Sequence, residues 1–82
     1  MEANVMIVNT ECGLVAYQIN GGKYGVLELL EEYSELESLK VIEGDLESLG
    51  EKVIVNIHTQ KKIKVFVKNF GMNRADALWS VS

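Results

Sequence analysis

A stripe of basic side chains with one aromatic residue among them is the clearest chemical feature of this sequence. In residues 62–68 the aliphatic residues Ile63, Val65 and Val67 alternate strictly with the other four, so that the two sets face opposite sides of a strand. The residues of this stripe are Lys62, Lys64, Phe66 and Lys68. Lysines roughly 7 Å apart can neutralise successive phosphates, and a phenyl ring offers a surface on which a base stacks. The solvated face of an antiparallel sheet would show the same pattern.

Other polar residues close to the stripe in the sequence extend it into a candidate binding surface. These residues are Asn56, His58, Lys61 and Arg74. The net charge of −4 at pH 7 opposes the binding of a polyanion, so we expect any affinity for nucleic acid to be weak.

No set of residues predicts a catalytic or metal site. The only histidine, His58, falls at a predicted turn, and the only cysteine, Cys12, lies in a distant segment without an activating partner. Glu43, Asp45 and Glu47 alternate within a strand-like run and would share one face. A solvated acidic strand is the more typical reading of such a run than a calcium site. We therefore expect no enzymatic activity, no cofactor and no metal.

Acidic and basic residues are segregated along the chain. Residues 26–51 carry many acids and a single lysine, Lys40, whereas all charged residues in 52–74 are basic. Two opposite electrostatic faces, or mutual neutralisation across the folded surface, would both follow from this pattern. Segments of opposite sign also allow one molecule to bind a protein partner or a second copy of itself. We therefore expect a protein partner or a homo-oligomer.

The first part of the chain is rich in strand signals. Residues 5–9 and 14–19 are apolar β-type runs around Gly13, which indicates either one bent strand or a tight hairpin. The dipeptide Asn20-Gly21 then predicts a hairpin whose second strand spans residues 24–30.

Residues 26–39 carry two competing signals. Their leucines and glutamates favour a helix, and the apolar residues recur at helical spacing. However, the preceding turn requires a partner strand, and no strong N-cap residue precedes Val26. We favour a strand over residues 24–30 and then an acidic loop or helical turn over residues 31–39. A helix over residues 26–39 is the alternative.

The second half of the chain contains the strongest structural prediction. After a strand-like run over residues 41–46, the runs 52–59 and 62–68 are joined by a short polar turn and predict an antiparallel hairpin with one apolar face. In the first of these two runs, the apolar residues that share a face are Val53, Val55 and Ile57.

A short helix is predicted at the end of the chain. Asn73 is a good N-cap residue, Asp76 lies in the first turn, and Met72 can contact Ala77 as a hydrophobic staple. A helix of this length is unstable alone, so it must dock on the sheet. The side chains expected to dock are Leu78 and Trp79.

The segment GLVAYQINGGKYGVLEL resembles the first hairpin of cold-shock and other OB-fold domains. In these domains a strand that begins with glycine turns through a polar link into an aromatic-Gly-hydrophobic strand. The matching positions are Gly13, Tyr24 and Gly25, and the later VIEGDL resembles the strand that follows. The resemblance implies a small β-barrel. It departs from the family at the RNA-binding strands, which carry several exposed aromatics where this segment offers only Tyr17 and Tyr24.

Taken together, these patterns predict one domain over residues 1–82, mainly β, forming a small barrel or curled antiparallel sheet of about five strands with a short C-terminal helix. The alternative fold is α+β, with the helix over residues 26–39. The expected function is a non-enzymatic binding or regulatory module that acts through protein–protein contacts, self-association included. Weak single-stranded nucleic-acid binding through the hairpin at residues 56–68 is the alternative. No leader-like or membrane-spanning run stands out, and an unpaired cysteine suits a reducing compartment, so we expect a cytoplasmic protein without membrane contact.

Overall fold

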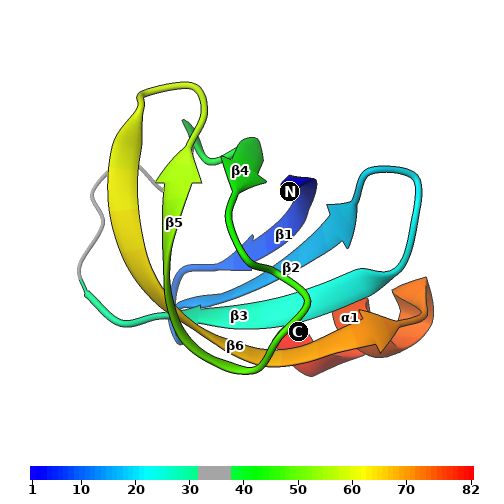
Figure 1. Cartoon of the computed structure of the whole chain (residues 1–82). Helices are drawn as coiled ribbons and strands as arrows, with labels where there is room; N and C mark the ends of the chain where they lie inside the picture. The colour runs from blue at the N-terminus through cyan, green and yellow to red at the C-terminus, as the bar shows by residue number, and fades with distance from the viewer. Residues whose placement is uncertain (32–37) are drawn as a thin grey trace.

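Six strands form a closed antiparallel barrel, and one short helix follows the last strand (Figure 1). The computed structural model describes residues 1–31 and 38–82. The elements are β1 (Glu2–Asn9), β2 (Leu14–Ile19), β3 (Tyr24–Leu29), β4 (Val41–Glu43), β5 (Gly50–Asn56), β6 (Lys61–Met72) and α1 (Arg74–Val81). Around the barrel the order is β1-β2-β3-β6-β5-β4. The mainly β prediction with a C-terminal helix is therefore confirmed.

The first three strands form two successive hairpins. Residues 10–13 make a tight turn between β1 and β2, in which Gly13 has a φ of 71°, so the hairpin is correct and the single bent strand is not. Asn20 and Gly21 form the turn between β2 and β3, as predicted.

The alternative helix over residues 26–39 is wrong at its start, because residues 26–29 belong to β3. This strand is hydrogen-bonded to β2 on one side and to β6 on the other. Those two ladders satisfy the backbone groups that a helix would have paired locally, and they outweigh the helix propensity of Leu and Glu. The loop or helical turn predicted for residues 31–39 falls mostly on residues 32–37, which lie outside the described residues.

The described barrel interior is mainly apolar, and the buried side chain of Tyr17 crosses it. Tyr17 on β2 donates a hydrogen bond from its Oη to the backbone carbonyl of Leu46, at 2.8 Å. Gly25 is the register partner of Tyr17 on β3, and a Cβ there would lie only 2.8 Å from Cε2 of the ring. The other buried hydrophobic side chains of this interior cluster are those of Ala3, Val15, Leu27, Leu39, Ile42, Leu46, Ile54, Ile63, Val65 and Val67.

A second, smaller apolar cluster lies outside the barrel, under α1. Ala16 of β2 and Val26 of β3 point outward there and are covered by Ala77 and Val81 of the helix. The predicted N-cap is confirmed, because the Asn73 side chain accepts a hydrogen bond from the Asp76 amide at 2.8 Å. Met72 and Leu78 also pack against this cluster, which agrees with the predicted staple. Trp79, by contrast, was expected to dock and is 83% exposed, because Ala77 and Val81 occupy the buried side of the helix.

The strand predicted over residues 41–46 is shorter than expected. β4 ends at Glu43, so Glu43, Asp45 and Glu47 do not share a strand face as predicted. The Asp45 carboxylate instead accepts hydrogen bonds from Ser48 Oγ at 3.0 Å and from Lys52 Nζ at 3.3 Å. These two bonds hold the pKa of Asp45 below its usual value.

The predicted hairpin of residues 52–68 is confirmed as β5 and β6, but its first strand ends at Asn56 rather than at Thr59, because residues 57–60 form the turn. The buried face of β5 is also the opposite of the predicted one. Ile54 pairs with Ile63 and points into the barrel, whereas Val53 pairs with Lys64 and points outward. β5 has apolar residues on both faces, so its own periodicity does not decide which face is buried. The strictly alternating partner β6 decides it through the register.

Candidate binding surface

The lysine stripe has the geometry that the sequence predicts. Ile63, Val65 and Val67 of β6 are buried in the barrel, and the four stripe residues are exposed on its outer surface. Phe66 is 41% exposed. The ring thus lies on the outer face of the sheet between charged side chains.

Acidic side chains flank Phe66 on both neighbouring strands. The register pairs Phe66 with Glu28 of β3 and with Glu51 of β5, which places their Cβ atoms about 5 Å from that of Phe66. Lys68 forms an ion pair with Glu28, with 3.8 Å between Nζ and Oε1. The basic stripe is therefore bordered by carboxylates, and the linear charge segregation of the sequence becomes local mixing on one surface.

Exposed apolar side chains complete this surface. Val53, next to Lys64 on the outer face, is 54% exposed. Leu30 follows β3, and its amide donates to the Lys64 carbonyl. Leu49 immediately precedes β5, and the pairing of Gly50 with Val67, continued by one residue, sets it beside Lys68. Both leucines are exposed. We call this surface the Phe66 face, and it comprises Glu28, Leu30, Leu49, Glu51, Val53, Lys62, Lys64, Phe66 and Lys68.

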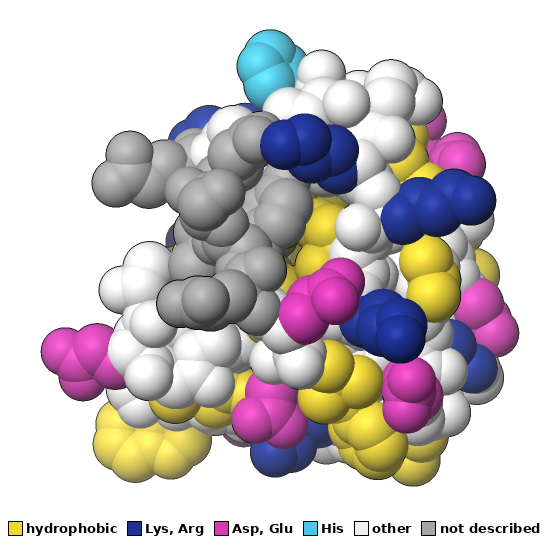
Figure 2. Space-filling model, turned by 90° about the vertical axis from the view of Figure 1, so that its left-hand side faces the viewer, with side chains coloured by type: hydrophobic (Ala, Val, Ile, Leu, Met, Phe, Trp, Pro, Cys, Tyr) yellow, Lys and Arg dark blue, Asp and Glu magenta, His cyan; other side chains and the backbone are white. Residues whose placement is uncertain are grey.

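Figure 2 views the molecule from the side on which β5 and β6 lie in Figure 1. Basic, acidic and hydrophobic side chains interleave on that side, and none of the three kinds forms a continuous field. The mixture of signs around Phe66 is what neutralisation across the folded surface predicts, and residues 32–37, which include Glu32, Glu35 and Glu37, lie outside the described residues.

Two of the candidate residues do not belong to this surface. Asn56 is fully buried, because it lies two residues after Ile54 and therefore points to the same, inner side of β5. Its Oδ1 accepts a hydrogen bond from the His58 amide at 3.0 Å, and its Nδ2 is 3.5 Å from Ser38 Oγ, so it stabilises the turn after β5. Arg74 is the first residue of α1, beyond the far end of β6, and Figure 1 shows α1 and the β5–β6 turn at opposite ends of the barrel.

The other two candidates, His58 and Lys61, lie at the β5–β6 turn and are exposed. They are adjacent to Lys62 at one end of the Phe66 face. The residues that sequence reasoning missed are Glu28, Leu30, Leu49, Glu51 and Val53. The register of the β5–β6 hairpin could have placed Glu51 and Val53 beside the stripe from the sequence. The positions of Glu28 and Leu30 depend instead on the pairing of β3 with β6, which the sequence does not show.

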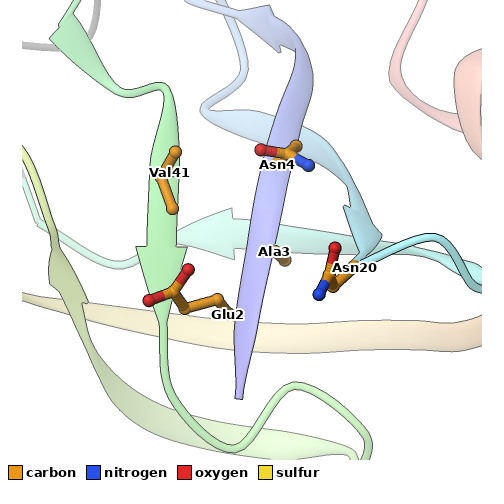
Figure 3. A pocket seen from close by; sticks show the side chains of 5 residues that line it. All are labelled: Glu2, Ala3, Asn4, Asn20 and Val41. Carbon is orange, nitrogen blue, oxygen red and sulfur yellow. The ribbon is translucent and has the colours of Figure 1, made fainter.

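The described residues line at least two hollows on the surface. The first has a volume of about 120 Å³ and is lined by Glu2, Ala3, Asn4, Asn20 and Val41 (Figure 3). Figure 3 shows the Glu2 carboxylate and the Asn20 amide on opposite sides of β1, so its polar groups do not converge on one point. A volume this small is below the range of typical small-molecule sites.

The second hollow has a volume of about 270 Å³ and lies beside α1. It is lined by Leu14, Val26, Lys68, Asn69 and Ser80. Because Lys68 belongs both to this hollow and to the Phe66 face, the two features are adjacent. The hollow is large enough to hold one apolar side chain.

Residues 1–31 and 38–82 contain no candidate metal centre and no candidate membrane-spanning helix. No group of three or more His, Cys, Asp or Glu side chains there could hold a metal ion. No helix in this part of the chain is long and apolar enough to cross a membrane. Comparison of the chain with protein-family models, with curated proteins and with solved structures finds no match.

Proposed function

We propose that this protein is a non-enzymatic binding module that contacts another protein chain through the Phe66 face. The observation that carries the proposal is the exposed phenyl ring of Phe66, with Leu30, Leu49 and Val53 around it and charges of both signs between them. Aromatic side chains surrounded by smaller apolar groups supply most of the binding energy in protein interfaces. Charges at their border give orientation and specificity.

Single-stranded nucleic-acid binding through residues 56–68 is the second candidate. It is supported by the exposure of Lys62, Lys64 and Phe66 in one line and by a barrel consistent with an OB-like fold. Two features weaken it. Glu28 and Glu51 lie beside the phenyl ring, and Lys68 is already paired with Glu28. Each carboxylate next to the stripe repels the phosphates that the lysines would attract.

Photo-crosslinking in cells tests the two candidates against each other. A benzophenone amino acid in place of Lys62 lies on the Phe66 face, and the same amino acid in place of Lys23 lies in the exposed β2–β3 turn and serves as the matched control. We expect protein adducts from position 62, identified by mass spectrometry, and few from position 23. Adducts to nucleic acid at position 62 would favour the second candidate. Equal yields at both positions would contradict a specific role of the Phe66 face.

A further inference from the structure

The charges around Phe66 alternate in sign. Lys64 and Lys68 lie on either side of it along β6, and Glu28 and Glu51 lie on either side of it across the sheet. Going around the ring, the order is therefore Lys64, Glu51, Lys68, Glu28. With this order, the positive charges of one face can meet the negative charges of the same face on a second copy. Whether they do depends on the direction of the symmetry axis that relates the two copies.

We propose, as an extension of the proposed function, that the partner of the Phe66 face is the same face of a second copy of this chain, related by a two-fold axis. A two-fold axis between two faces exchanges positions across a line through Phe66. If that line followed β6 or ran straight across it, Glu would meet Glu or Lys would meet Lys. If it runs diagonally, every Lys meets a Glu of the other copy, and Phe66 meets Phe66.

Two diagonal directions of the axis bring every Lys to a Glu of the other copy, and the position of α1 distinguishes between them. α1 stands above the outer surface at the corner between Glu28 and Lys68, where it covers Val26. A diagonal through that corner would place α1 against α1 of the other copy and would hold the two Phe66 rings apart.

The other diagonal runs through Leu30, Phe66 and Leu49, and it uses every exposed apolar side chain of the face. Leu30 then meets Leu30, and Leu49 meets Leu49. Val53 lies opposite the hollow beside α1 of the other copy, whose volume of about 270 Å³ can accept it. Lys68 meets Glu51, Lys64 meets Glu28, and the two β6 strands cross at roughly a right angle, a known mode of sheet packing.

The face comprises only a few residues on the outer wall of a closed barrel, so the dimer is expected to be transient. We therefore expect concentration-dependent association of the purified chain over about 10 µM to about 1 mM, seen as a rise in mass by analytical ultracentrifugation. Phe66→Ala should weaken it roughly tenfold or more, since the ring lies at the centre of the contact. Met6→Ala is the matched control, because Met6 is an exposed hydrophobic residue on β1, the strand opposite β6 in the barrel order, and should change nothing.

Charge reversal tests the chosen diagonal. Lys68→Glu alone and Glu51→Lys alone should each weaken association, because each creates two like-charge contacts between the copies. The double variant Glu51→Lys/Lys68→Glu should restore it, whereas Glu51→Lys/Lys64→Glu should not. Circular dichroism establishes that each variant keeps the barrel.

The outcomes separate this inference from the function on which it rests. A wild-type chain that stays monomeric up to about 1 mM would overturn the two-fold dimer. A Phe66→Ala variant that associates as strongly as the wild type would overturn it as well. The proposed function would then still stand if position 62 crosslinks to a different protein. Rescue by Glu51→Lys/Lys64→Glu instead of Glu51→Lys/Lys68→Glu would overturn the chosen diagonal.

Discussion

Tyr17 is the residue on which the interior of the barrel depends most. Its ring fills the space that Gly25 leaves open, and its hydroxyl satisfies the buried carbonyl of Leu46. The phenol is removed from water, so desolvation raises its pKa well above the usual value, and the charges of Glu47 and Asp45 act in the same direction. The folded protein therefore keeps Tyr17 protonated at a pH where the unfolded chain does not.

The stability of the protein should fall at alkaline pH because of Tyr17. Above about pH 10 the unfolded chain releases the phenolic proton while the folded chain retains it, so the free energy of unfolding decreases as the pH rises. Tyr17→Phe should lose about 1–2 kcal/mol at pH 7, because the Leu46 carbonyl loses its partner. It should also show a shallower decline between about pH 9 and pH 11. Urea denaturation of both proteins across this range measures the difference, and parallel pH curves would contradict it.

The helix α1 acts at the scale of the element, because it turns an outward patch of β2 and β3 into a second buried cluster. Ala16 and Val26 would be exposed without it. The helix has eight residues, which is too short for independent stability, so its cap and its docking must hold it in place. Asn9 of β1 contributes by donating a hydrogen bond from Nδ2 to the Val81 carbonyl at 2.8 Å.

Removing the N-cap should weaken the whole protein through this helix. Asn73→Ala leaves the Asp76 amide without its acceptor, and we expect a loss of about 1 kcal/mol in the free energy of unfolding. Arg74→Ala, at the adjacent exposed position, is the matched control and should change stability by less than about 0.5 kcal/mol. Chemical denaturation measures both. Equal effects of the two substitutions would show that the cap is not the reason.

At the scale of the whole molecule, the barrel is closed by strands of very unequal length. β5 and β6 pair along the full length of β5, whereas β4 spans only Val41–Glu43 and joins β1 to β5 at the seam of the barrel. Short ladders open more readily than long ones, because fewer hydrogen bonds and less buried surface must be lost.

Amide hydrogen exchange should reveal this unequal closure. We expect the amides of β4 to exchange by local opening, well before those of β5 and β6, whose exchange should approach the rate set by global unfolding. Exchange followed by NMR, residue by residue, provides the measurement. The same protection in β4 and in β6 would mean that the barrel opens only as one cooperative unit.

The sequence by itself determined those features that depend on neighbours along the chain. The hairpin turns at Asn20-Gly21 and before Lys61, the alternation of β6 and the Asn73 cap all follow from local backbone chemistry, and the structure agrees with each. The exposure of the lysine stripe was predictable for the same reason, because Ile63, Val65 and Val67 must be buried.

Only the tertiary structure decided which residues surround that stripe and which face of β5 is buried. Glu28 and Phe66 are far apart in the chain, and the pairing of β3 with β6 brings them into one row. Ile54 rather than Val53 points inward because β6 fixes the phase of a strand that is apolar on both sides. Cross-strand register is a non-local property, so the acidic and apolar partners of Phe66, and with them the character of the surface, could not be derived from the local sequence.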